Sequence, residues 1–255
     1  MHVHGSDFDA NCDTMPAWQR GLTVAVFKRC ERVVVIGLYW RDYVVGKLGL
    51  DPARVVLIHN GAPATAMTGK FSGDAVPRLL MLGELGPRKG TPELVAALAS
   101  PALKSRRWSA TLAGNGPVEK YRREVAGLAL ADRVALPGWQ SGVEVRALLA
   151  AADIFILPSR QEGLPIAILE AMAGGAAVIS TPVGAIGDAI IDGETGLLVP
   201  PGDAAALANA IARLIDDPAL RARLAVNARK RFAAMFTIDC TADAVAAMYR
   251  EVGVA

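Results

Sequence analysis

The most informative residues in this sequence are two carboxylates, Glu162 and Glu170, which lie eight positions apart. Glu162 stands in a loop that contains Gly and Pro, whereas Glu170 stands inside an apolar pattern with helical spacing. Because an ionised carboxylate accepts two hydrogen bonds from a vicinal diol, a carboxylate pair in a crevice suits a hydroxyl-rich ligand. The alternative interpretation is a solvated loop residue and a residue on a helix surface.

The segments on either side of this pair indicate how the two side chains would be positioned. An apolar run at 152–158 precedes them, and another at 176–180 follows the helical pattern. The order strand, loop, helix, strand is typical of a parallel α/β sheet, whose ligands lie at the carboxyl ends of strands, beside helix N-termini. We therefore expect Glu162 at this rim, and Glu170, about one turn into the helix, facing the crevice.

The same unit recurs along the chain from Arg78 onwards, with a Gly-containing loop after most strands. In the first unit, Thr91 is predicted to cap the helix, with Pro92 in its first turn. The repetition predicts an α/β fold with a doubly wound parallel sheet. The predicted strands span residues 78–82, 108–113, 133–136, 152–158, 176–180 and 196–199.

Residues 1–60 are predicted to form only part of an α/β domain, with two strands at 32–37 and 54–58. A sheet usually has about five strands, so we expect that further chain belongs upstream of this segment. Residues 61–77 are rich in Ala, Thr, Gly and Pro and are predicted to be a linker. Residues 78–235 would form the main ligand-binding domain. Residues 236–255 would form a last helix that packs back toward the N-terminal part.

The loop from Gly83 to Gly90 joins a predicted strand to a helix N-terminus and carries Arg88 and Lys89. Glycines allow close approach of the backbone, and a helix terminus with two cations favours a diphosphate. The alternative interpretation is a solvated basic turn. A second loop, Gly114-Asn-Gly-Pro117, lacks the third glycine of a dinucleotide fingerprint, so nicotinamide binding is not predicted.

Composition excludes several other classes of protein. The chain has 255 residues, 53% of them apolar, and a net charge of +2, which does not indicate a nucleic-acid partner. Its three cysteines, an odd number, predict thiols in a reducing compartment. No apolar run suits a membrane span, and the first residues do not form a signal peptide, so a cytoplasmic location is predicted. Lys28, Arg29 and Arg32 are interpreted as a solvated surface or as a peripheral contact with anionic lipid at the inner membrane face.

No metal site is predicted. Asp7-Phe8-Asp9 matches the D-x-D pattern of metal chelation, but three residues match by chance and a polar loop is the favoured interpretation. The three histidines lack metal-ligand spacing. Among them, His4 is interpreted either as a functional loop residue or as a mobile exposed one.

Taken together, the loops resemble the C-terminal half of family 4 glycosyltransferases of the GT-B fold, over about residues 30–250. The most specific part of the resemblance is the cluster at 158–203. The matching motifs are Asn60-Gly61, Lys89-Gly90, Gly114-Asn-Gly-Pro117, Pro137-Gly138, Pro158-Ser-Arg-Gln-Glu-Gly-Leu-Pro165, Glu170-Ala-Met-Ala173, Thr181-Pro-Val-Gly184, Asp192-Gly-Glu-Thr-Gly196 and Val199-Pro-Pro-Gly-Asp203.

The resemblance implies a role for several of these loops. It implies that Glu170 holds the ribose of a nucleotide-diphosphate sugar, that Glu162 lies against the donor sugar and that Lys89 neutralises the diphosphate. It also implies a C-terminal Rossmann-like GT-B domain that binds the donor. The residues implied to line the sugar, phosphate and base sites are Gly163, Leu164, Pro165, Gly114, Gly116, Pro137 and Gly138.

The sequence departs from the family pattern at three places. Glu84 stands where the family has Arg, and Arg88 is the candidate substitute. Asp188, a shorter acid, stands where the family has Glu. The chain begins inside the acceptor-binding domain, where His4 matches the loop that carries the family's active-site His.

The resemblance implies retaining transfer of a sugar from a nucleotide-diphosphate donor to a glycan, lipid or small-molecule acceptor, without a metal or other cofactor. The alternatives are a nucleotide-sugar-binding module that needs an N-terminal partner chain, and a GT-B nucleotide-sugar epimerase. Because residues 1–60 offer so few strands, we expect the chain alone to bind nucleotide but to transfer little sugar.

Overall fold

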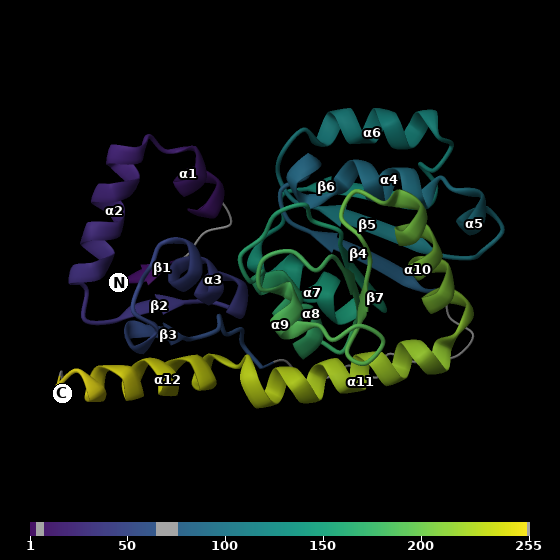
Figure 1. The fold of residues 1–255 in the computed structure, drawn as a ribbon. Helices are drawn as coiled ribbons and strands as arrows, with labels where there is room; N and C mark the ends of the chain where they lie inside the picture. Colours follow the sequence, from purple (N-terminus) through teal and green to yellow (C-terminus); the bar gives the residue numbers. More distant parts are fainter. Residues whose placement is uncertain (4–7, 65–75, 254–255) are drawn as a thin grey trace.

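The computed structural model describes residues 1–3, 8–64 and 76–253. It has a smaller part that ends before the linker and a larger part that follows it (Figure 1). Two long helices, α11 (Pro218–Met235) and α12 (Ile238–Glu251), run one after the other along the lower edge of the view and connect the two parts.

The larger part contains one parallel sheet of six strands in the order β6-β5-β4-β7-β8-β9. The order reverses between β4 and β7, which is the switch point where ligands of doubly wound sheets bind. The predicted fold class is therefore confirmed. The strands are β4 (Arg78–Leu82), β5 (Ser109–Ala113), β6 (Val134–Gly138), β7 (Ile154–Leu157), β8 (Ala177–Ser180) and β9 (Leu197–Leu198).

Helices cover the sheet, and this explains the apolar runs in the sequence. All residues of β7 and β8 are buried, as expected of strands covered on both faces. Helix α8 packs on β7 and β8, and α11 packs on α8. The helices of this part, besides α11, are α4 (Thr91–Leu98), α5 (Pro101–Lys104), α6 (Val118–Gly127), α7 (Gly142–Ala151), α8 (Ile166–Ala173), α9 (Ile186–Ala189) and α10 (Ala204–Asp216).

The prediction that Thr91 caps α4 is wrong. Gly90 is the N-cap, with a φ of 73°, and a Cβ at this position would lie 2.0 Å from the carbonyl oxygen of Pro158. Thr91 is the first helical residue, and its hydroxyl accepts a hydrogen bond from the amide of Gly86 at 2.8 Å. The threonine therefore closes the preceding loop, which includes a 3₁₀ turn at Pro87–Lys89.

The smaller part has three parallel strands, with β2 (Val33–Val35) between β1 (His2–Val3) and β3 (Val55–Leu57). The expectation of two strands missed β1, because two residues are too few to form a recognisable apolar pattern. Its helices are α1 (Phe8–Thr14), α2 (Ala17–Arg29) and α3 (Leu38–Asp42), followed by a π-helical turn at Tyr43–Lys47 and a 3₁₀ turn at Pro52–Arg54.

Helix α12 passes under the small sheet, where Met248 packs with Val34 and Ile58. It begins at Thr237, whose hydroxyl accepts a hydrogen bond from the amide of Cys240 at 3.1 Å. Thr237 also pairs with Ala62 in an isolated bridge. The C-terminal helix thus belongs spatially to the small part, while the greater share of the predicted linker lies outside the described residues.

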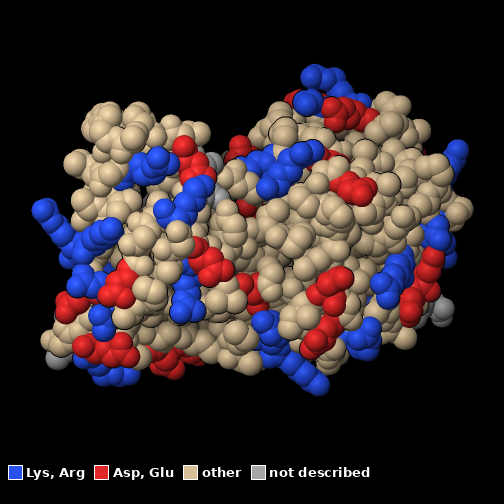
Figure 2. All heavy atoms as spheres, viewed as in Figure 1, with Lys and Arg blue, Asp and Glu red and all other residues tan. Residues whose placement is uncertain are grey.

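The surface carries charges of both signs. On the face drawn in Figure 2, basic and acidic side chains of the described residues are interspersed, and no single sign of charge dominates it. No helix in the described part of the chain has the length and hydropathy that crossing a membrane requires.

Candidate functional site

Three loops meet at the carboxyl ends of β4, β5 and β7, beside the switch point of the sheet. The first two loops are packed backbone against backbone. A Cβ on Gly114 would lie 1.8 Å from the carbonyl oxygen of Gly83, and a Cβ on Gly116 would lie 2.4 Å from that of Leu85. Both glycines also have positive φ values, 150° and 99°, which L side chains rarely adopt. These predicted residues therefore bring the two loops together.

A cavity of about 350 Å³ opens beside these loops. It contains two residues from the predicted set, Gly114 and Glu170, and it adds Trp139 and Gln140, which sequence reasoning missed. Trp139 is 72% exposed, which is unusual for so large an apolar side chain, and it directly follows the Pro137-Gly138 motif. The cavity is lined by Leu82, Gly83, Glu84, Ala113, Gly114, Asn115, Trp139, Gln140, Val145, Ala167 and Glu170.

Pro137 and Gly138 lie at the end of β6 rather than in the loop after it. The carbonyl oxygen of Gly138 accepts a hydrogen bond from the amide of Gly114 at 2.9 Å. This hydrogen bond ties the end of β6 to the loop after β5. Trp139 and Gln140, which follow Gly138, line the cavity.

Glu170 lies on α8 and is half-buried between two cavities. The second cavity, of about 240 Å³, lies beyond Glu170 and is also lined by Gln140 and Arg146. Among the described residues, none donates a hydrogen bond or forms an ion pair with the Glu170 carboxylate. Burial raises the pKa of the Glu170 carboxyl. A carboxylate that is partly desolvated and unpartnered at a cavity wall is available to accept hydrogen bonds from a ligand.

Glu162 is bound within the protein, in contrast to Glu170. Its side chain is 5% exposed, and its Oε1 accepts hydrogen bonds from Lys89 Nζ at 2.5 Å and from Ser159 Oγ at 2.7 Å. Lys89 comes from the loop after β4 and Glu162 from the loop after β7, so the fold brings together the two predicted residues of opposite charge. Their pairing offsets part of the cost of burying each charge.

Arg88 forms an ion pair of its own. Its guanidinium lies 3.9 Å from the carboxylate of Glu84, four positions earlier on the same loop. Both side chains are well exposed, at 40% and 60%, and Glu84 lines the cavity. The prediction that Arg88 replaces a missing basic residue at Glu84 thus stays a prediction, although the two side chains share one edge of the site.

The loop at 162–165 presents backbone donors. In the described chain, the amides of Gly163 and Leu164 have no protein acceptor. The following helix, α8, has Pro165 as its N-cap, without a side-chain cap. Free amides beside a helix N-terminus are suited to binding an anion.

The remaining predictions near the N-terminus cannot be placed, because His4 and Asp7 lie outside the described residues. Within the described residues there is no group of three or more His, Cys, Asp or Glu side chains that could hold a metal ion. The three cysteines form no disulfide bond there.

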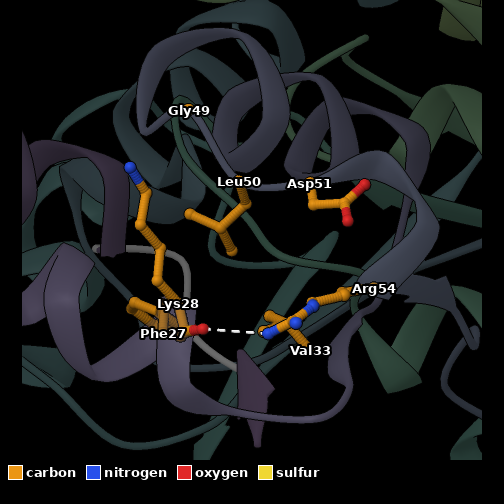
Figure 3. A pocket seen from close by; sticks show the side chains of 7 residues that line it. All are labelled: Phe27, Lys28, Val33, Gly49, Leu50, Asp51 and Arg54. Carbon is orange, nitrogen blue, oxygen red and sulfur yellow. Dashed lines mark hydrogen bonds between the residues drawn. The ribbon is translucent and has the colours of Figure 1, made fainter.

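A separate cavity of about 290 Å³ lies in the small part, next to the first residue of β2 (Figure 3). Two of its polar side chains are engaged locally: Arg54 Nη1 donates to the carbonyl oxygen of Lys28 at 3.0 Å, and Asp51 accepts from the amide of Ala53 at 3.0 Å. It lies at the amino ends of the small sheet and contains none of the predicted site residues.

Comparison with known proteins identifies a family that matches this chain. The family model "Glycosyl transferases group 1" matches residues 70–231. The chain is 33% identical over 185 residues to an alpha-D-kanosaminyltransferase of Streptomyces kanamyceticus, covering 72% of this chain and 48% of the relative. It spans about half the length of the curated relatives it matches.

Solved structures show the same architecture. A sucrose-phosphate synthase of Thermosynechococcus elongatus is 28% identical with a TM-score of 0.83, covering 98% of this chain and 67% of that chain. The Anabaena protein HepE in complex with UDP is 21% identical with a TM-score of 0.83, covering 98% of this chain and 71% of that chain, a likeness that shows the shared fold.

Proposed function

The chain belongs to the group 1 glycosyl transferases, and from this premise we propose that it binds a nucleotide-diphosphate sugar as a retaining, family 4 type transferase. The observation that carries the proposal is the half-buried carboxylate of Glu170, which has no partner among the described residues and lies at the wall of the cavity beside the switch point. A ribose diol in this cavity would supply the two donors that the carboxylate lacks. HepE, which shares the fold, is solved in complex with UDP, and this supports a nucleotide as the ligand.

In this proposal, the donor lies along the rim of the sheet. With the ribose at Glu170, the diphosphate extends toward the amides of Gly163 and Leu164 and the ammonium of Lys89. The sugar then lies next to Glu162. Two amides, a helix N-terminus and one cation are sufficient to bind a diphosphate, so we propose that no metal ion is required.

Transfer breaks the bond between the anomeric carbon and the diphosphate oxygen, and negative charge develops on that oxygen. Lys89 and the two amides stabilise this charge in the transition state. The acceptor hydroxyl attacks from the leaving-group side, forms the new bond to the anomeric carbon and gives its proton to the departing phosphate oxygen. Glu162 holds hydroxyl groups of the donor sugar and does not form a covalent intermediate. The acceptor is proposed to be a glycan, a lipid or a small molecule.

The test compares the affinities of the protein for the diphosphate and the monophosphate of one nucleoside. Lys89→Ala should lower the affinity for UDP, GDP or ADP, whichever the wild type binds most tightly, by roughly 10-fold or more, the worth of one charged hydrogen bond. The affinity for the matching monophosphate should fall much less. Lys120→Ala, on the outer helix α6, is the matched control. Equal losses for diphosphate and monophosphate would contradict the role of Lys89, and a chelator that abolished binding would contradict the metal-free proposal.

A further inference from the structure

The contact between the small and large parts of the molecule lies directly behind the loop at 162–165. Asp188 Oδ2, on α9, accepts a hydrogen bond from the amide of Leu38 at 2.8 Å, and His59 Nε2 lies 3.0 Å from the same oxygen. Leu38 and His59 both belong to the small part. The side chains of Asp188 and His59 are 11% and 15% exposed, so water competes little for this contact.

Asp188 supplies a cap that the small part lacks. Leu38 is the first residue of α3, and its N-cap, Gly37, offers no side chain. A carboxylate at a helix N-terminus accepts a hydrogen bond from an otherwise unpaired amide and interacts favourably with the helix dipole. Gly37 is needed for this approach, because a Cβ at that position would lie 2.1 Å from the Cβ of Ala185. The start of α3 is therefore fixed against the segment that precedes α9.

The same contact continues into the loop proposed to bind the donor. The amide of Ala185 donates to the carbonyl oxygen of Gly163 at 2.9 Å, and Asn60 Nδ2 donates to the carbonyl oxygen of Leu164 at 2.9 Å. Two successive carbonyl groups of the loop are thus held, one by each part of the molecule.

These two bonds determine where the loop's amides point. A peptide unit is planar and trans, so a carbonyl oxygen and the next N–H point in opposite directions. The bond from Ala185 to the oxygen of Gly163 therefore aims the N–H of Leu164 away from Ala185. The bond from Asn60 fixes the next peptide, which leads into Pro165 and the start of α8.

We propose that Asp188 is a positioning residue that couples the docking of the small part to the orientation of the Leu164 amide. It acts through Leu38, His59 and the segment around Ala185, and it does not itself touch the donor. This inference rests on the proposed donor site. The part of the donor held in the cavity at Glu170 should not depend on Asp188, whereas the sugar diphosphate at the loop should.

The first test compares an intact donor with its nucleoside monophosphate, using calorimetry on the full chain. UDP-glucose, GDP-mannose and ADP-glucose serve as probes, and the one that the wild type binds most tightly is carried forward. Asp188→Ala should weaken the binding of that donor by about 5- to 150-fold, the range of a typical coupling between sites, and change the monophosphate affinity by less than about 2-fold. Asp188→Asn, which keeps an acceptor oxygen without the charge, should lie between wild type and Asp188→Ala.

Asp192→Ala is the matched control, because Asp192 also caps a backbone amide, that of Leu198 at 2.8 Å, but does so within the large part. It should leave the ratio of donor to monophosphate affinity unchanged. Asp188→Ala and Asp192→Ala giving the same ratio, or Asp188→Ala weakening both ligands equally, would overturn the proposal.

A second measurement needs no ligand and separates this inference from the proposed function. Hydrogen exchange at the amide of Ala185, which is bonded to the carbonyl oxygen of Gly163, should be faster in Asp188→Ala and in Asn60→Ala than in the wild type or Asp192→Ala. If the wild type bound none of the three donors, the proposed function would fail and the exchange rates would still decide the role of Asp188. Unchanged exchange in both variants would refute the coupling, whatever the donor data showed.

Discussion

Lys89 donates a hydrogen bond to Glu162 across 2.5 Å, although 73 positions separate the two residues in the sequence. Without a ligand, the two charges proposed to meet the donor therefore neutralise each other. A donor diphosphate must compete with Glu162 for the ammonium, and the donor sugar must compete with Lys89 for the carboxylate. Because of this competition, we expect the ion pair to respond differently to a simple nucleoside diphosphate and to the intact donor.

The first prediction concerns stability. Lys89→Met should lower the free energy of unfolding by up to about 3–5 kcal/mol, because it leaves a 5% exposed carboxylate with Ser159 as its one remaining donor among the described residues. In the double variant with Glu162→Gln, part of this loss should be recovered. Denaturant titrations measure it, with Lys120→Met as the control, whose exposed pair with Glu124 is worth at most about 1 kcal/mol. Additive losses in the double variant would show that the two side chains are not coupled.

The second prediction separates nucleotide from sugar. Glu162→Gln should leave the affinity for a nucleoside diphosphate within a few-fold of the wild type, or raise it, since Lys89 is freed from its ion pair. The intact donor should bind less well relative to the diphosphate, because the amide is a weaker acceptor for sugar hydroxyls. Competition binding with both ligands measures the ratio. A large loss of simple diphosphate binding would reverse the roles proposed for Glu162 and Glu170.

Much of this site could be predicted from the sequence, because local patterns carry its parts. The buried strands are continuous apolar runs. The loops that follow them hold Lys89 and Glu162, and helix α8 holds Glu170, as expected. Tertiary contacts have no such local signal. The pairing of Lys89 with Glu162 depends on the order of β4 and β7 in the sheet, which adjacent residues do not encode.

The small part shows the same limit of local patterns. The sequence distinguishes Asn60 only as part of the Asn60-Gly61 motif, because its bond to the carbonyl of Leu164 exists only after the two parts dock. Asp188 is distinguished in the sequence only as a shorter acid, and its cap on Leu38 likewise forms only on docking. Trp139 could have been suspected from its place after Pro137-Gly138, but its exposure is a property of the fold.

The third prediction follows from the raised pKa of Glu170. Because burial makes the folded state hold this proton more tightly than the unfolded state does, the contribution of Glu170 to stability is lost as the pH rises through the folded pKa. Glu170→Gln, which keeps a neutral side chain, should therefore be more stable than the wild type at neutral pH. This difference in stability between the variant and the wild type should disappear as the pH falls. Thermal unfolding across this pH range measures it, and a wild type that gains stability over the variant with rising pH would contradict the account.

The central claim is that this chain binds a nucleoside diphosphate and that Glu170 holds the ribose. Calorimetric titration of the wild type and Glu170→Ala with UDP, GDP and ADP tests it most directly. Because a hydrogen bond to a charged group is worth about 1.5–3 kcal/mol, the variant should bind the best of the three ligands roughly 10- to 150-fold more weakly. Equal binding of that ligand by the two proteins, or no binding of any of the three by the wild type, would contradict the claim.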